Sequence, residues 1–259
     1  VNGVKVTTRN QTDILGDGTV RYEGNGQQGV LILEGACIDN LSDEDVEALV
    51  VSHIQHLTLR LVGENRIGMG EHVPVNGIQA AQLTIEGSLQ IGARAACFRT
   101  QEIEVASGTI DAYIKTPDDE VAGILGVALW AQERMNIQGG DISVHYAASF
   151  SPFSYGLYCV KDINIHGGTI RIGAEDSRFL SVGVISSEQL TIAGGEVSVY
   201  GIDDAINARN FRMTGGVVEA KSMDVSKDAV CRLVYLAEIT GGELTMVNMH
   251  PQPASGSLL

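Results

Sequence analysis

The stretch LTIAGGEVSV, residues 190–199, decides how the rest of this sequence is interpreted. Leu190 and Ile192 alternate with other residues, two glycines interrupt, and the alternation resumes at Val197. Side chains two residues apart on a strand point to the same face, and glycine adopts turn conformations at little cost. The stretch therefore predicts either two strands joined by a glycine turn or a glycine-rich loop that binds phosphate.

The same pattern recurs along the chain, at starts separated by 20 to 32 residues. A longer version, LTLRLVGENRI, begins at Leu57, and the other copies are LTIEGSLQI from Leu83, IEVASGTIDA from Ile103, MNIQGGDISV from Met135, INIHGGTIRI from Ile163, FRMTGGVVEA from Phe211 and AEITGGELTM from Ala237. A phosphate loop needs a helix after its glycines, whereas each pair here is followed by another strand pattern. The glycines are therefore interpreted as corners of a repeat.

The repeat predicts an all-β fold, a right-handed parallel β-helix with three strands in each coil. A propeller blade needs about 40 residues, more than the spacing allows. The third strand of each coil is assigned to segments such as GILGVALW and DAINAR. Two columns of inward residues are expected: Ile85, Val105, Ile137, Ile165, Ile192, Met213 and Ile239 in one, and Leu89, Ile110, Ile142, Ile170, Val197, Val218 and Leu244 in the other.

Composition excludes several classes of partner. The 259-residue chain has a formal net charge of −15, which disfavours nucleic acid and anionic lipid. No apolar run is long enough to span a bilayer, so membrane insertion is not expected. The four cysteines lie 60 or more residues apart and are interpreted as buried free thiols.

We divide the chain into three parts. Residues 1–56 are assigned to N-terminal strands, a cap and the first coil, residues 57–248 to the β-helix, and residues 249–259 to a tail or linker toward further domains. Within LSDEDVEALVVS, Ser42 and Asp45 have capping-box spacing. This segment is either a short helix or an acidic corner that leads into a strand.

The N-terminal text, VNGVKVTTRNQTDILGDGTVRYEGNGQQGVLILEGACI, residues 1–38, resembles the opening of a group of secreted, repeat-rich proteins of gut clostridia and related Gram-positive bacteria. Those openings carry the motifs VTxxN, VLGDGTVSY and LTL, and after them GxNxI and LTIxGxGxL repeats. The GxNxI motif is matched here by Gly63 to Ile67. The resemblance covers nearly the whole chain. It implies an extracellular or cell-surface β-helix with a carbohydrate-binding or adhesin-like role.

A looser similarity links the chain to clostridial β-helix proteins that bind polygalacturonate with calcium through DDGIHA-like turns. The counterpart here is DDAINA, Asp203 to Ala208, with Ala205 in place of glycine and Asn207 in place of histidine. Calcium takes six to eight oxygen ligands, so Asp203 and Asp204 need backbone carbonyls to complete a site. The pair is either part of a calcium site or a solvated turn.

Aromatic side chains give the second candidate site. Five of them, Tyr146, Phe150, Phe153, Tyr155 and Tyr158, fall in HYAASFSPFSYGLY, and Trp130 precedes them by one coil. Sugar rings stack on aromatic faces, while serine and histidine neighbours can hydrogen-bond hydroxyl groups. The segment therefore predicts a glycan-binding surface, with a loop that packs on itself as the alternative.

Catalysis is not favoured. Glycoside hydrolysis needs two carboxylates at a defined separation, but the outward acids after the glycines are dispersed and the six histidines are single. We therefore expect an extracellular or cell-surface binding or adhesion module that contacts a glycan or a host or cell-wall polymer. The alternatives are a structural stalk without ligand and a polysaccharide lyase or glycoside hydrolase.

Overall fold

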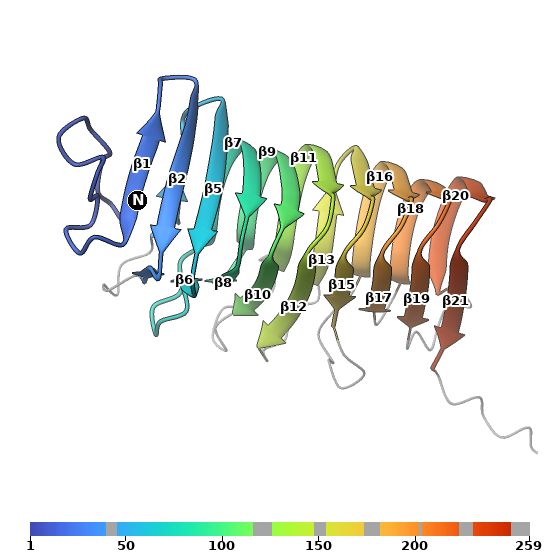
Figure 1. The fold of residues 1–259 in the computed structure, drawn as a ribbon. Helices are drawn as coiled ribbons and strands as arrows, with labels where there is room; N and C mark the ends of the chain where they lie inside the picture. The colour runs from blue at the N-terminus through green and yellow to red at the C-terminus, as the bar shows by residue number, and fades with distance from the viewer. Residues whose placement is uncertain are drawn as a thin grey trace, which may run out of the picture.

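The structure, a computed structural model, consists of strands that lie side by side in a row from the N-terminal to the C-terminal end (Figure 1). It describes residues 1–39, 46–115, 126–147, 154–173, 182–201, 204–222 and 230–249. Within these ranges there is no helix, so the all-β prediction is confirmed. The predicted helix at Ser42 and Asp45 and residues 250–259 of the predicted tail 249–259 lie outside the described residues, whereas the alternative strand is present over Ala48–Val51.

The first sheet has 12 strands in the described chain; ten of them follow one another along the sheet in sequence order, and the other two, β4 and β14, pair beside this path. Its strands are β1 (Val20–Gly24), β2 (Gln28–Glu34), β4 (Ala48–Val51), β5 (His56–Val62), β7 (Asn76–Glu86), β9 (Ala96–Ser107), β11 (Gly126–Ile137), β13 (Ser154–Cys159), β14 (Asp162–Ile165), β16 (Val182–Ile192), β18 (Asp204–Met213) and β20 (Cys231–Ile239). All pairs in this sheet are parallel except β1 with β2.

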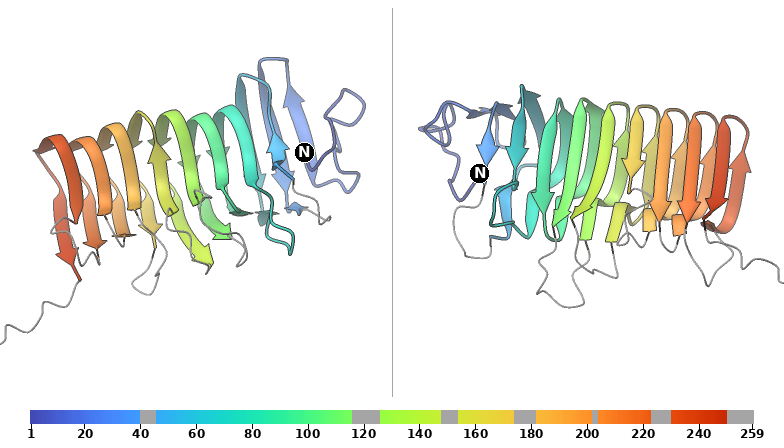
Figure 2. Two further views of the ribbon diagram at one scale, coloured as in Figure 1. Left: turned by 180° about the vertical axis from the view of Figure 1, so that it is seen from behind. Right: turned by 90° about the horizontal axis from the view of Figure 1, so that it is seen from below.

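The second sheet has nine described strands, again in sequence order and all parallel. Its strands are β3 (Cys37–Ile38), β6 (Asn65–Ile67), β8 (Leu89–Ala93), β10 (Thr109–Lys115), β12 (Asp141–Ala147), β15 (Thr169–Ile172), β17 (Glu196–Gly201), β19 (Val217–Ser222) and β21 (Glu243–Asn248). From β5 onward the chain alternates between the two sheets, except that β13 and β14 follow one another in the first sheet (Figures 1 and 2). Each repeat thus adds a strand to both sheets.

The opening stretch forms one such crossing. Leu190 to Ile192 end β16, the glycine pair turns the chain, and Glu196 begins β17. Gly195 has a φ of 86°, a region that side chains with a Cβ rarely adopt. A Cβ at this position would also lie 2.6 Å from the Gly168 carbonyl oxygen of the preceding turn, which accepts the Glu196 N–H at 2.8 Å. Stacked turns therefore require glycine at this position for two reasons: the backbone conformation and the lack of space for a Cβ atom.

The two predicted columns of inward residues are confirmed, residue by residue. In the first sheet Ile85, Val105, Ile137, Ile165, Ile192, Met213 and Ile239 are successive register partners. In the second sheet the partners are Leu89, Ile110, Ile142, Ile170, Val197, Val218 and Leu244. Except for the last residue of each column, all are at most 3% exposed. Burial of each such aliphatic side chain contributes ~1.5–3 kcal/mol before conformational entropy is counted.

The third corner of the predicted coil differs from expectation. The segments assigned to a third strand run directly into the strands that end at the glycine turns, so β11, β16 and β18 are long strands of one sheet. A register shift lies within each pairing, for example between Ala131 and Arg134. A bulge bends a strand without ending its ladder, and it replaces a separate turn here. In two repeats the strands stay separate: β4 and β5 both pair with β7, and β13 and β14 both pair with β11 and β16.

Candidate functional site

The outer face of the first sheet carries a row of large side chains on three neighbouring strands. Arg99 on β9 is the register partner of Trp130 on β11, and Trp130 is the partner of Tyr158 on β13. We call these three residues the aromatic row. Their preceding neighbours Phe98, Leu129 and Leu157 are completely buried, so strand alternation turns the row outward. Parallel neighbours lie about 4.8 Å apart, which makes the row continuous.

A cation–π contact and an aromatic contact restrain the side chains of the aromatic row. The Arg99 guanidinium carbon lies 5.2 Å from the centroid of the Trp130 ring, within the range of a cation–π interaction. The rings of Tyr155 and Tyr158 are 5.8 Å apart and tilted by 41°. Trp130, Tyr155 and Tyr158 are half-buried and Arg99 is exposed. Each ring therefore has support from the sheet below it and keeps part of its surface in contact with solvent.

The structure brings together three of the six aromatic residues predicted to bind a glycan: Trp130, Tyr155 and Tyr158. Tyr146 lies elsewhere, on β12 of the second sheet, as the register partner of Ile114. Its hydroxyl is buried and has no hydrogen-bond partner among the described residues, and burial raises the pKa of this phenol well above its usual value. Phe150 and Phe153 lie outside the described residues.

Asp204, predicted as a calcium ligand, begins β18 and is 2% exposed. Its Oδ2 atom lies 3.3 Å from the Arg232 Nε and accepts a hydrogen bond from the Asn207 amide at 3.3 Å. The guanidinium supplies the positive charge that a buried carboxylate requires. Asp203 lies outside the described residues. No group of three or more His, Cys, Asp or Glu side chains in the described ranges is arranged to hold a metal ion, and calcium binding stays a prediction.

The outward acids that follow the glycine turns are divided between two rows of the second sheet. Asp111 shares a row with Ser143 and Arg171, whereas Asp141 is the partner of Thr109 and Thr169. Asp111 Oδ1 is 3.9 Å from the His145 Nε2, and His145 stacks on Tyr113 with centroids 4.6 Å apart. Asp111 therefore contacts a histidine that stacks on a tyrosine, and among the described residues it does not face a second carboxylate.

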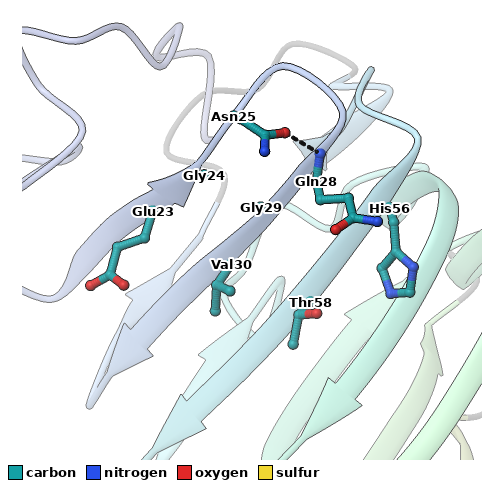
Figure 3. Close-up of a pocket in the computed structure, with 8 residues that line it drawn as sticks. All are labelled: Glu23, Gly24, Asn25, Gln28, Gly29, Val30, His56 and Thr58. Atoms are coloured by element: carbon teal, nitrogen blue, oxygen red, sulfur yellow. Dashed lines mark hydrogen bonds between the residues drawn. The ribbon is translucent and has the colours of Figure 1, made fainter.

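A polar pocket of about 490 Å³ lies near the N-terminal end of the first sheet (Figure 3). Glu23, Gln28, His56 and Thr58 line it, and the Asn25 carboxamide oxygen accepts the Gln28 N–H at 3.0 Å to hold the turn between β1 and β2. Sequence reasoning missed this pocket because it depends on an antiparallel hairpin. The signal that predicts such a hairpin is the turn text EGNGQQG between two alternating runs.

An apolar pocket of about 650 Å³ lies between the N-terminal segment and the start of the first sheet. Val4, Val6, Tyr22, Leu31 and Leu49 are among its lining residues. Lys5, Ser52 and His53 add polar groups to this mostly aliphatic lining. The aromatic row differs from it, because two aromatic side chains and an arginine lie on neighbouring strands at matched register positions.

Comparison of the chain with models of known protein families, with curated proteins and with solved structures finds no match. In the described part of the chain, no helix has the length and apolar character needed to cross a bilayer.

Proposed function

We propose that the chain is an extracellular or cell-surface binding or adhesion module that contacts a glycan through the aromatic row. The observation that carries the proposal is the register of Arg99, Trp130 and Tyr158 on three adjacent strands, with two aromatic side chains turned outward. The resemblance of residues 1–38 to secreted repeat proteins supports the location.

The scaffold of this module, in our proposal, is a right-handed parallel β-helix. Alternation of consecutive strands between two parallel sheets supports it, because each crossing then returns the chain to the next position in the same sheet. Connections between parallel strands of one sheet are right-handed in almost all proteins. The two uninterrupted columns of buried aliphatic residues hold neighbouring repeats in register.

The chemistry of the aromatic row suits a sugar. The apolar C–H face of a pyranose packs on an indole or phenol ring, and polar groups beside the rings fix the hydroxyl groups. Here Arg99 and the Tyr158 hydroxyl supply hydrogen-bond donors next to the rings. Because the strands already fix the positions of the side chains, little ordering is needed on binding, which favours affinity.

Binding is tested by a glycan array, followed by titration calorimetry with any glycan bound by the full chain. Trp130→Ala and Tyr158→Ala should each lower affinity by about 10-fold or more, since aromatic side chains dominate binding at such surfaces. Tyr113→Ala is the matched control, because Tyr113 is a stacked, partly exposed tyrosine of the other sheet. The proposal fails if no glycan binds or if the control weakens binding equally.

A structural spacer is the second candidate, and the completeness of the buried columns favours it, since they stabilise the fold without a ligand. It predicts no glycan binding and no functional effect of Trp130→Ala. A lyase or hydrolase is the third candidate. It predicts shortening of the bound glycan with time, measured by size-exclusion chromatography of the reaction mixture.

A further inference from the structure

The C-terminal end of the molecule exposes residues of interior type. β20 and β21 are the last described strands of the two sheets, so each has one edge whose backbone groups have no partner strand in the described chain (Figure 1). The large apolar side chains exposed on these two strands are Val234 (58%), Tyr235 (70%), Leu236 (55%), Ile239 (51%), Met246 (55%) and Val247 (36%). We call this set the C-terminal face.

Two of these residues belong to positions that are buried in the preceding repeat. Ile239 is the register partner of Met213, which is 0% exposed, and Met246 is the partner of Ala220, also 0% exposed. Proteins protect exposed strand edges with charges, bulges or covering segments, because an unprotected edge pairs with another chain. The C-terminal face combines such an edge with an apolar surface.

We propose that a second copy of this chain binds the C-terminal face across a two-fold axis, with β20 and β21 each pairing antiparallel with the same strand of the partner. A two-fold interface requires a surface that is complementary to itself. This inference goes beyond the proposed glycan binding, because it concerns a different part of the molecule.

The sequence of β20 has this self-complementarity. When the axis passes at Tyr235, Arg232 faces the partner's Glu238, and Glu238 faces the partner's Arg232. In the same register Cys231 faces the partner's Ile239 and Leu233 faces the partner's Ala237. Opposite charges thus meet on one side of the strand, where they extend the ion pairs of Arg232 with Asp204 and of Glu238 with Arg212 on β18, and apolar residues meet on the other. Directly opposed pairs of both kinds stabilise antiparallel strands.

The strand β21 is consistent with the same symmetry. An axis that crosses it at Thr245 places Leu244 opposite the partner's Met246. Both residues occupy the interior side of the sheet, as their register partners Val218 and Ala220 show. The two cores would then meet as one continuous core, and the edge N–H and C=O groups of both strands would gain partners.

The association state of the full chain tests the proposal by sedimentation velocity between about 1 and 100 μM, a range that brackets micromolar affinity. The wild-type chain should form a dimer. Tyr235→Glu should raise the dissociation constant at least ~10-fold, because two carboxylates then face each other at the axis. Val62→Glu, at a position on β5 that is 44% exposed, is the matched control and should leave the dimer intact.

Cross-linking tests the register. Opposed residues of antiparallel strands have Cα atoms about 4.5–5.5 Å apart, within the range of a disulfide. In a Cys37→Ser background, which removes the exposed thiol, Tyr235→Cys should form a disulfide-linked dimer under mild oxidation, and Val62→Cys should not. A wild-type chain that stays monomeric, as it would if residues 250–259 cover the face, overturns the proposal. A dimer unaffected by Tyr235→Glu also overturns it.

Discussion

The two ends of the molecule are closed in different ways. At the N-terminal end β1 pairs antiparallel with β2, Val20 and Ile14 are buried, and the Tyr22 N–H donates to the Gln11 carbonyl at 2.7 Å. At the C-terminal end the last parallel strands expose Ile239 and Met246. The N-terminal segment and β1 therefore cover the first repeat, whereas the described residues include no strand that covers β20 and β21.

The contrast between the ends shows which repeat positions stabilise the core and which form a surface. A column residue such as Ile165 is buried because a repeat lies on each side of it. Ile239 has the same chemistry and column, but among the described residues a repeat lies on one side of it alone, and half of its surface is exposed. Position within the stack, rather than residue type, determines whether a repeat position stabilises the core or presents a contact surface.

The largest expected effect compares two positions of one column. Ile165→Ala should lower the free energy of unfolding by ~2–5 kcal/mol, the usual cost of a buried isoleucine truncation. Ile239→Ala should cost under ~1 kcal/mol, because half of the side chain is already exposed. Urea denaturation measures both, in a Tyr235→Glu background so that the chains are compared as monomers. Equal costs would contradict the difference between interior and end.

A smaller effect compares the two ends directly. Val20→Ala on β1 should lower the free energy of unfolding by about 2 kcal/mol, since Val20 is fully buried under the N-terminal segment. Met246→Ala should change it by less than ~0.5 kcal/mol, as expected of an exposed position. Thermal unfolding in the same Tyr235→Glu background distinguishes the two. A comparable loss from Met246→Ala would mean that the C-terminal end is covered within the monomer.

The smallest expected effect concerns pH and buried thiols. Burial raises the pKa of Cys97 from 9.0 to about 12, so the folded chain retains a proton that the unfolded chain releases above pH 9. The resulting stability is present below pH 9 and is lost as the pH rises toward 12. At pH 10 the loss is about 1 kcal/mol for one thiol. Burial also raises the pKa of Cys231, at the C-terminal end, to about 12.

Urea denaturation at pH 8 and pH 10 measures this loss. Cys97→Ala should reduce the difference in unfolding free energy between the two pH values. Cys37→Ala is the control, because Cys37 is exposed near the N-terminal end, and it should change the difference less. If both substitutions have the same effect, the interior thiol is not the source of the alkaline loss.

The repeating interior was predictable from the sequence because a period of two residues fixes which side chains point inward. Glycine pairs fix where each alternation restarts. The alternation and the glycine pairs together predicted that Ile137 lies beside Ile165 and Ile142 beside Ile170. The sequence could not show whether the chain bends within β11 by a turn or by a bulge, because both are compatible with the same alternation of apolar residues. The antiparallel pairing of β1 with β2 was missed because it follows no repeat.

The candidate site was predictable only in part. Trp130 and Tyr158 become neighbours through parallel register, which the repeat spacing alone does not fix across an insertion. The burial of Tyr146 follows from the alternation Ile142, Val144, Tyr146 along β12, a signal that the local cluster of aromatic residues obscured. Arg99 carried no sequence signal, because its contact with Trp130 joins residues of successive repeats.

The contrast between the ends is tested most directly by amide hydrogen exchange of the full chain at about 1 and 100 μM, concentrations on either side of micromolar dissociation. We predict that the amides of β20 and β21 that point away from β18 and β19 exchange quickly in the dilute sample and slowly in the concentrated one. We predict that amides of β1 and β2 are equally protected in both. Protection of the same β20 and β21 amides that does not depend on concentration would contradict the account.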